Sequence, residues 1–294
     1  MSLALVLAVL GAALPSQYVI PGDNVFPEGV TLRPGTDTFY VSSTSDGTIY
    51  RGTLDSGRMR VFLGPGRNGR TFANGLRASR DHLVVAGSAT GRIFVYDLPS
   101  GRFMRRFETG SGGLVNDVAF APNGDAYATD SRRGLLFRIP ARALTKRTGP
   151  VPLKPFLELS DTPVGQYANG VVSAGERYLL VVGTASGALV RIDLKTKRVR
   201  EVRLSEDDAL PAGDGLARRG SALYVVNSAS RVTKVLLAAN WLSGAVRNQI
   251  TSPRFRFPTT VQIAGRRLLV VNSQFDKRGG TPELPFTLSA VRRP

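Results

Sequence analysis

The 294-residue sequence contains no cysteine and a single histidine, His82. Without cysteine there is no disulfide framework, no zinc–thiolate site and no thiol nucleophile. One histidine argues against a histidine-based zinc site and against a Ser-His-Asp triad, because both need an imidazole at a defined place. His82 follows Arg80 and Asp81 at the polar entrance to an expected strand, which predicts a solvent-exposed turn residue.

Acidic residues are scarce as well: 22 Asp and Glu stand against 39 Lys and Arg, which gives a net charge of +17 at pH 7. Such an excess is compatible with nucleic acid, an anionic surface or an anionic ligand. The basic residues, however, occur singly or in pairs such as Arg132-Arg133, and no basic run is interleaved with stacking aromatics. We therefore expect a solvated, arginine-rich surface rather than a nucleic-acid interface.

Long hydrophobic runs are also missing. The apolar run from Leu3 to Leu14 is too short for a membrane span, but it has the length of a signal-peptide core. Gly11-Ala12-Ala13 supplies small residues for cleavage. Residues 1–16 are therefore expected to be a signal peptide or N-terminal extension, which predicts a secreted, periplasmic or cell-envelope protein. If the run is instead a buried strand or helix, the protein is cytoplasmic.

One four-residue motif recurs six times. Its third residue carries a side-chain oxygen in every copy, and successive copies are 42 to 53 residues apart: Glu28, Asn74, Asn116, Asn169, Asp214 and Thr259. A hydroxyl residue follows each of these after 14 to 16 residues, and we expect it to brace neighbouring backbone: Thr44, Ser88, Ser131, Thr184, Ser228 and Ser273. Two motifs in register over six units of about 45 residues are typical of β-propeller blades.

Each unit shows a pattern of four antiparallel strands. The second is the most apolar, as in Leu179–Val182, and the fourth is weaker and charged, as in Arg198–Val202, which suits an outer edge strand. The sequence therefore predicts an all-β fold, a six-bladed β-propeller over residues 17–294 with four antiparallel strands per blade. Because the last unit lacks a clear fourth strand, we expect residues 17–20 to supply it and close the ring.

The longest step between copies contains an extra segment, from Arg142 to Gln166, with three prolines. Long loops often carry function, but a variable surface loop has the same appearance in sequence. Both interpretations of residues 142–166 stay open at this stage.

In a propeller, the residue that precedes each innermost strand points into the central channel at one face. The six oxygen-bearing residues therefore converge there, and two of them, Glu28 and Asp214, are carboxylates. Carboxylates crowded into a narrow channel are costly unless a cation compensates them. Calcium, which takes about six to eight oxygen ligands, fits this set, whereas magnesium is possible but prefers tighter octahedral geometry. Zinc lacks its nitrogen and sulfur ligands.

The Glu-Gly, Asn-Asp, Asn-Gly and Asp-Gly tips, in this order on a six-fold repeat, resemble those of the calcium-dependent propeller hydrolases. This family includes regucalcin (senescence marker protein), bacterial gluconolactonases and diisopropylfluorophosphatase. The resemblance extends over residues 24–275. It implies one catalytic calcium ion surrounded by four residues: Glu28, Asn116, Asn169 and Asp214. Asn74 and Thr259 would line the channel at the tips where family members vary.

The resemblance further implies a hydrolase that acts on a small-molecule lactone, ester or phosphotriester. Asp214 is the expected base or nucleophile as well as a metal ligand, and Asn116 is expected to hold the metal and orient the substrate. Sugar lactonases of the family carry an arginine two residues before the first matching asparagine, where this chain has Leu114. The alternative is a non-catalytic propeller that binds a partner or an anionic envelope component. Neither interpretation fixes an oligomeric state.

Overall fold

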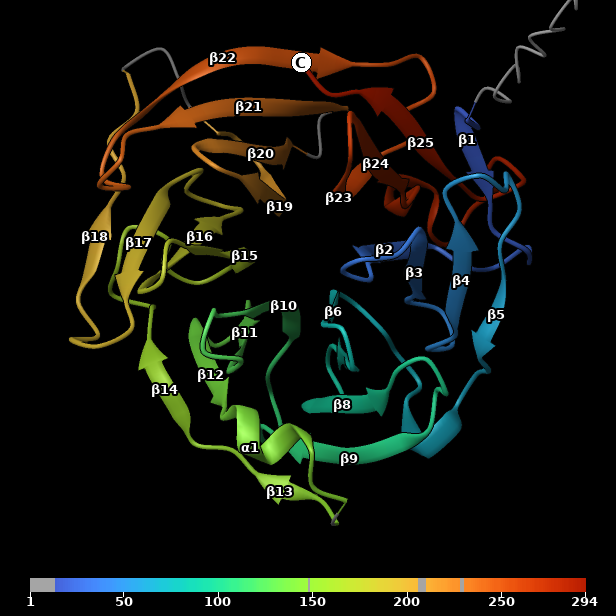
Figure 1. Ribbon diagram of the computed structural model, residues 1–294, viewed down its shortest axis with the longest axis horizontal. Coiled ribbons are helices and arrows are strands. Elements are labelled where there is room, and N and C mark those ends of the chain that lie inside the picture. Colours follow the sequence, from blue (N-terminus) through green and yellow to red (C-terminus); the bar gives the residue numbers. More distant parts are fainter. Residues whose placement is uncertain (1–13, 148, 206–209, 228–229) are drawn as a thin grey trace, which may run out of the picture.

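The computed structural model describes residues 14–294 except 148, 206–209 and 228–229. Six sheets, each built on four antiparallel strands, form a ring about a common axis (Figure 1), so the predicted six-bladed β-propeller is confirmed. The expected signal segment falls mostly on residues 1–13, which lie outside the described part of the chain. Within that part, no helix combines the length and apolar character that a membrane span needs.

In five blades the strands follow sequence order from the axis outward, and in the sixth blade the N-terminal strand is the outermost one. The first blade consists of β2 (Pro27–Leu32), β3 (Thr38–Ser43), β4 (Ile49–Thr53) and β5 (Arg60–Leu63). The second consists of β6 (Leu76–Ala78), β7 (His82–Ala86), β8 (Arg92–Asp97) and β9 (Phe103–Glu108). The third consists of β10 (Val115–Phe120), β11 (Ala126–Asp130), β12 (Leu135–Ile139) and β14 (Pro155–Glu158). The fourth blade consists of β15 (Ala168–Ala174), β16 (Tyr178–Gly183), β17 (Leu189–Asp193) and β18 (Val199–Glu201). The fifth consists of β19 (Gly213–Arg219), β20 (Ala222–Asn227), β21 (Arg231–Leu237) and β22 (Gly244–Thr251). The sixth consists of β23 (Pro258–Ala264), β24 (Arg267–Asn272), β25 (Thr287–Arg292) and the N-terminal β1 (Gln17–Val19).

The N-terminal strand closes the ring, as predicted. β1 (Gln17–Val19) pairs antiparallel with β25 and becomes the outer strand of the sixth blade. Its other side reaches the first blade, because Val19 N–H donates to the backbone oxygen of Gly57 at 2.8 Å and Met59 N–H donates to that of Val19 at 2.9 Å. The two ends of the chain are thereby locked together across the junction of blades six and one.

The segment 142–166 has a structural role. Its β14 is the outer strand of the third blade, while the short β13 (Val151–Pro152) pairs parallel with β9 and adds a fifth strand to the second blade. The helix α1 (Ala141–Leu144) leads into this excursion. The segment therefore joins the outer edges of two blades (Figure 1).

The hydrophobic core is divided into six clusters of described residues, one between each pair of neighbouring blades. The second strands contribute most to it because both faces of each blade are covered by its neighbours. In β20, for example, Leu223, Tyr224, Val225 and Val226 are all fully buried. This explains why the second strands read as continuous apolar runs rather than as alternating ones.

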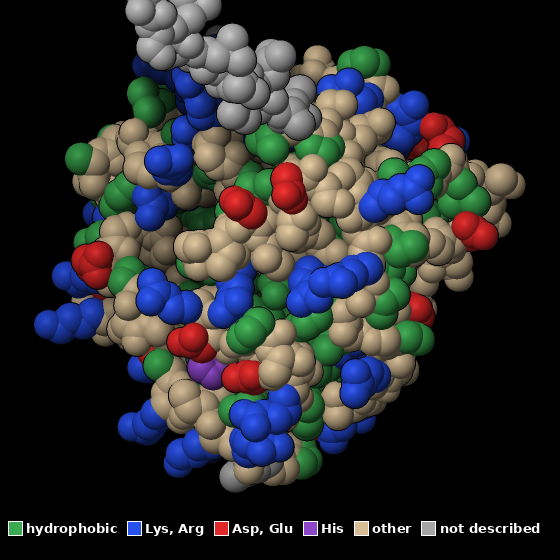
Figure 2. Space-filling model, turned by 45° about the vertical axis from the view of Figure 1, so that its right-hand side comes forward, with side chains coloured by type: hydrophobic (Ala, Val, Ile, Leu, Met, Phe, Trp, Pro, Cys, Tyr) green, Lys and Arg blue, Asp and Glu red, His purple; other side chains and the backbone are tan. Residues whose placement is uncertain are grey.

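Basic side chains are spread over the surface rather than gathered in one place. Figure 2 shows Lys and Arg scattered over the visible face among neutral side chains, in agreement with the solvated surface that the sequence predicts. His82 is the first residue of β7 and is half-buried, so it belongs to a strand rather than to an exposed turn. The apolar strand it begins extends one residue further than the sequence pattern indicates.

Candidate metal site in the central channel

Five of the six predicted channel residues lie at the start of the innermost strands, and Asn74 lies just before β6. In five blades the residue and its successor form a β-bulge, where the pairing of the first two strands shifts register: Glu28-Gly29, Asn116-Asp117, Asn169-Gly170, Asp214-Gly215 and Thr259-Thr260. The sequence pattern placed these tips before the strands. They lie inside them because one residue pair, such as Pro27 with Ser43, forms ahead of each bulge. A bulge re-aims a side chain and is common beside functional sites.

Glycine follows the channel residue in four of the six copies because neighbouring inner strands approach closely there. A Cβ on Gly170 would lie 2.3 Å from the backbone oxygen of Asp214 in the next blade, and a Cβ on Gly215 would lie 2.7 Å from Cα of Thr260. Side-chain carbons do not approach backbone atoms so closely. These glycines therefore set the spacing of the tips around the channel.

A hydroxyl group of the third blade fixes the orientation of Asn116. Its Nδ2 donates to Ser131 Oγ at 2.8 Å, and that hydroxyl donates in turn to the backbone oxygen of Ala168 in the next blade, also at 2.8 Å. A hydroxyl has one proton, and here the proton goes to Ala168. Ser131 therefore accepts from the amide, so that the nitrogen end of Asn116 faces Ser131 and Oδ1 faces away from it.

Asn169 repeats this arrangement one blade further. Its Nδ2 donates to Thr184 Oγ1 at 2.9 Å, and Thr184 donates to the backbone oxygen of Gly213 at 2.8 Å. The expectation that these hydroxyl residues brace neighbouring blades is therefore confirmed at Ser131 and Thr184, and they also orient the channel amides. Ser228 lies outside the described residues.

Glu28 and Asp214, from the first and fifth blades, supply the carboxylates. Both side chains are buried. Burial raises the pKa of Glu28 well above its ordinary value, and the charges of Asp214 and Asp117 raise it further. The cost of crowding that the sequence predicts is therefore present in the folded chain.

Two channel oxygens are buried without a hydrogen-bond partner among the described residues: Glu28 Oε2 and Asn116 Oδ1. Buried polar atoms are ordinarily paired, since an unpaired one costs about 1–3 kcal/mol. The amide oxygen of Asn116 can only accept, and an ionised Glu28 can only accept as well. Both atoms therefore suit a cation or a donor group in the channel.

The carboxylates alone do not make a metal site. Within the described ranges, no three His, Cys, Asp or Glu side chains are grouped closely enough to hold an ion. A metal would therefore need the amide oxygens of Asn116 and Asn169 beside the carboxylates of Glu28 and Asp214. An all-oxygen set with two carboxylates is the chemistry that calcium prefers.

Asp117 is a channel carboxylate that the sequence pattern did not single out. Its Oδ1 accepts a hydrogen bond from Val118 N–H at 2.8 Å, and its Oδ2 accepts one from Val171 N–H at 3.0 Å, so it joins the third and fourth blades. Burial raises its pKa, while the charge of Arg77 and these two hydrogen bonds oppose the rise. The sequence did contain a sign of it, because Asp117 stands at the motif position where four other copies have glycine.

The two remaining channel residues differ in their contacts. Thr259 is buried, and its hydroxyl donates to the backbone oxygen of Glu28 at 3.0 Å, which connects the sixth blade to the first. Asn74 is half-buried and precedes β6. The Thr259 hydroxyl therefore joins two blades of the ring.

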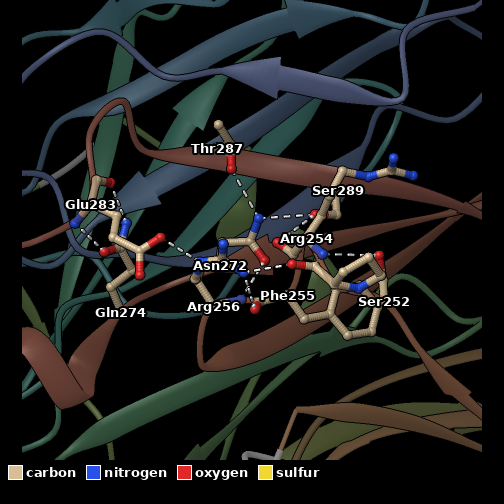
Figure 3. A network of polar contacts seen from close by, with 10 residues as sticks. Ser252, Arg254, Phe255, Arg256, Asn272, Gln274, Glu283, Thr287 and Ser289 are labelled. Carbon is tan, nitrogen blue, oxygen red and sulfur yellow. Dashed lines mark hydrogen bonds and ion pairs between the residues drawn. The ribbon is translucent and has the colours of Figure 1, made fainter.

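A polar network fixes the segment that leads into the sixth tip (Figure 3). Asn272, at the end of β24, donates from Nδ2 to the hydroxyls of Thr287 and Ser289 and accepts a hydrogen bond from Arg256 N–H at 3.2 Å. The Arg256 guanidinium pairs with Glu283 at 2.5 Å. The loop before the tip is thus anchored to β24 and β25.

In two other blades as well, the last residue of the second strand anchors the loop that precedes the channel residue. In the third blade, Asp130 accepts from Leu114 N–H at 2.9 Å, and in the fifth blade, Asn227 donates to the backbone oxygen of Pro211 at 2.7 Å. These buried polar side chains hold the backbone that aims the channel residues.

Apolar residues flank the channel residues. The residue two positions before each of them is apolar in all six blades: Phe26, Phe72, Leu114, Tyr167, Ala212 and Phe257. All of these except Phe72 and Leu114 have positive φ, a strained conformation for a bulky side chain. Phe72 and Tyr167 are 36% and 54% exposed, which leaves large apolar groups in contact with solvent next to the polar end of the channel.

Comparison by sequence assigns no family. No family model matches the chain. The guanine nucleotide-binding protein subunit beta of Oryza sativa subsp. japonica is 23% identical over 125 residues, which is 41% of this chain. The match spans about a third of the length of that curated relative (33%).

Solved structures share the fold over nearly the whole chain. The Malassezia sympodialis allergen Mala s 1 has a TM-score of 0.70 at 15% identity, covering 95% of this chain and 96% of the allergen. A catalytically inactive virginiamycin B lyase from Staphylococcus aureus with quinupristin has a TM-score of 0.62 at 12% identity, covering 95% and 99%. The RRP9 WD40 repeats have a TM-score of 0.62 at 11% identity, covering 95% and 100%.

At these identities the likeness shows the β-propeller fold alone. The neighbours include an enzyme as well as WD40 repeats. The fold therefore does not choose between catalysis and binding, and the choice rests on the chemistry of the channel.

Proposed function

We propose that the protein is a calcium-dependent hydrolase of lactones or esters, with one ion held by Glu28, Asn116, Asn169 and Asp214. The observation that carries this proposal is the pair of buried, unpartnered acceptors, Glu28 Oε2 and Asn116 Oδ1, beside a second carboxylate. The resemblance of the four tips to the regucalcin and gluconolactonase family supports it at a finer level than the fold does. Magnesium is the alternative ion.

The residues have distinct tasks in this proposal. Bound calcium would supply a Lewis acid that polarises a carbonyl or phosphoryl oxygen. Asn116 and Asn169, held by Ser131 and Thr184, keep their amide oxygens fixed and help to orient the substrate. Asp214 is the base or nucleophile, with its carboxylate at the same end of the channel. Glu28 acts as a ligand, because its side chain is buried and its Oε2 has no hydrogen-bond partner among the described residues.

The apolar flanking residues narrow the substrate class. Phe72 and Tyr167 expose aromatic surface next to the polar channel, and Leu114 stands where the sugar lactonases carry arginine. An apolar group on the substrate would cover this surface and gain about 25 cal/mol per Å² buried. We therefore expect alkyl or aryl lactones and esters to be better substrates than sugar lactones.

The test is a calcium titration of chelator-treated protein by calorimetry, combined with a panel of lactones, esters and phosphotriesters. We expect one-site binding and calcium-dependent turnover in the wild type. Asp214→Asn should fold normally, bind calcium more weakly and lose turnover. Asp37→Asn removes an exposed carboxylate and is the matched control, which should behave as the wild type.

The outcomes separate the proposals. Turnover retained in Asp214→Asn would remove this residue from the mechanism, and absence of specific calcium or magnesium binding would overturn the metal site. Calcium binding without turnover of any panel substrate would favour the non-catalytic alternative, in which the propeller binds a partner or an anionic envelope component. The net charge of +17 is the feature that favours this alternative.

A further inference from the structure

The inner strands carry a second polar group of residues, at the end opposite the carboxylates and amides. A cavity of about 180 Å³ lies there, lined by the later residues of β6, β10, β15, β19 and β23. The predicted channel residues come from the beginnings of these strands or just before them. The cavity and the candidate metal site therefore lie at opposite ends of the same strands.

The cavity is positively charged. Its polar lining consists of Arg77, Arg218, Gln262 and Ser173, without a carboxylate. Neither arginine forms an ion pair with another described residue. The charge of Arg77 opposes the rise in the pKa of Asp117 that burial causes, but both oxygens of that carboxylate already accept backbone hydrogen bonds. The lining therefore attracts anions.

Hydrogen bonds hold both guanidinium groups in place. Arg77 donates from Nε to the backbone oxygen of Val118 at 3.1 Å and from Nη1 to Gln262 Oε1 at 3.4 Å. Arg218 donates from Nε to the backbone oxygen of Ser173 at 2.6 Å, and its Nη1 also has a backbone partner. In each guanidinium, Nη2 makes no hydrogen bond to a described residue. Two fixed cations thus keep donors for a ligand, and fixed donors lose little entropy when they bind.

The surroundings of Arg218 favour a counter-ion. Its guanidinium lies 5.0 Å from the ring of Trp241. Burial lowers the pKa of Arg218, so its charge is incompletely solvated. An anion in the cavity would restore part of the lost solvation and would bind more strongly than at an exposed arginine.

We propose that this cavity binds a small organic oxyanion, a carboxylate or a phosphate monoester, whose oxygens accept hydrogen bonds from Arg77 and Arg218. The rest of the lining includes Phe120, Val172 and Ile263, which suit a short hydrocarbon part. The site is independent of the proposed metal site, because none of these residues belongs to the calcium-binding set.

The test uses butyrate, butyramide and propyl phosphate as probes, titrated by calorimetry at constant ionic strength. Butyrate or propyl phosphate should bind saturably with one site per chain, and the stronger of the two identifies the headgroup class. The neutral butyramide should not bind. Arg77→Gln and Arg218→Gln should each weaken anion binding about tenfold or more, the loss of one charge-assisted contact. Arg200→Gln, on the exposed outer strand β18, is the control for overall charge and should leave affinity unchanged.

Several outcomes would overturn this proposal. They are no saturable binding of either anion up to tens of millimolar, equal binding of butyramide, or the same loss in Arg200→Gln as in Arg218→Gln. Arg77→Gln also removes the charge that acts on Asp117, so its thermal stability is measured alongside. If that variant does not fold, Arg218→Gln decides the question, because Arg218 forms no contact with a channel carboxylate.

Discussion

The orientation of Asn116 rests on one hydroxyl, and removing that hydroxyl tests the geometry of the channel. In Ser131→Ala, Asn116 Nδ2 loses its acceptor and the backbone oxygen of Ala168 loses its donor. Ser131, Asn116 and Ala168 are all buried. An unpaired buried polar group costs about 1–3 kcal/mol. Allowing for partial rearrangement of the amide, we expect the free energy of unfolding to fall by about 2–4 kcal/mol, measured by urea denaturation.

The same substitution should weaken calcium binding. Without Ser131 the amide of Asn116 has no partner that distinguishes its two ends, so its oxygen faces the channel for only part of the time. A misdirected ligand loses most of its contribution, and we expect calcium affinity to fall about tenfold or more, a change of about 1.4 kcal/mol. Ser131→Thr keeps the hydroxyl and should retain affinity close to that of the wild type.

Ser273→Ala is the matched control from another blade. The Ser273 hydroxyl donates to the backbone oxygen of Phe257 at 2.5 Å, within its own blade, and accepts from no channel amide. This variant should lose stability but keep its calcium affinity. Wild-type calcium affinity in Ser131→Ala, or an equal loss of affinity in Ser273→Ala, would refute the role of the hydroxyl in orienting Asn116.

Two further predictions concern the ring itself. Tyr18 is fully buried, lies 5.0 Å from the ring of Phe39 and donates from its hydroxyl to the backbone oxygen of Leu54 at 2.8 Å. Tyr18→Ala should therefore lower the free energy of unfolding by about 3–5 kcal/mol and Tyr18→Phe by about 1 kcal/mol. A cost below about 1 kcal/mol for Tyr18→Ala in urea denaturation would show that closure by β1 is dispensable. Gly170→Ala places a Cβ against the backbone of the fifth blade and should cost at least about 1–3 kcal/mol, whereas Gly64→Ala has open space and should be nearly neutral. Equal melting temperatures for these two alanine variants would contradict the close approach of the inner strands.

The ring and its channel were predictable because each blade repeats the same physical requirements. A blade covered on both faces needs an apolar second strand, and a closed ring needs a fourth strand for its last blade. Residues 17–20 were the segment left over to supply that strand, and β1 does so. The recurrence of an oxygen-bearing side chain at one phase, from Glu28 to Thr259, likewise located the channel end of every blade.

Features that depend on contacts between different blades could not be predicted from the repeated sequence pattern. The pairing of β13 with β9 is parallel and adds a strand that the other five blades lack, so the repeat gives no sign of it. The close approach of neighbouring inner strands involves two blades at once, which no single unit reveals. In the sequence, Asp117 was only the second residue of the Asn-Asp tip, yet its side chain accepts a hydrogen bond from Val171 N–H in the next blade. Arg77 and Arg218 come together only because the second and fifth blades meet at the same axis.

The two ends of the inner strands carry opposite charges, carboxylates at one end and arginines at the other. Burial raises the pKa of Asp117, and the charge of Arg77 offsets part of that rise from within the chain. The charges that act on Glu28, those of Asp214 and Asp117, are both negative and both raise its pKa. A divalent cation at the carboxylate end would lower the pKa of Glu28 again. At the other end, a bound anion would stabilise the charge of Arg218. Because Arg218 contacts no channel carboxylate, loss of anion binding in Arg218→Gln should leave calcium affinity intact, and loss of both together would show that the two ends are one site.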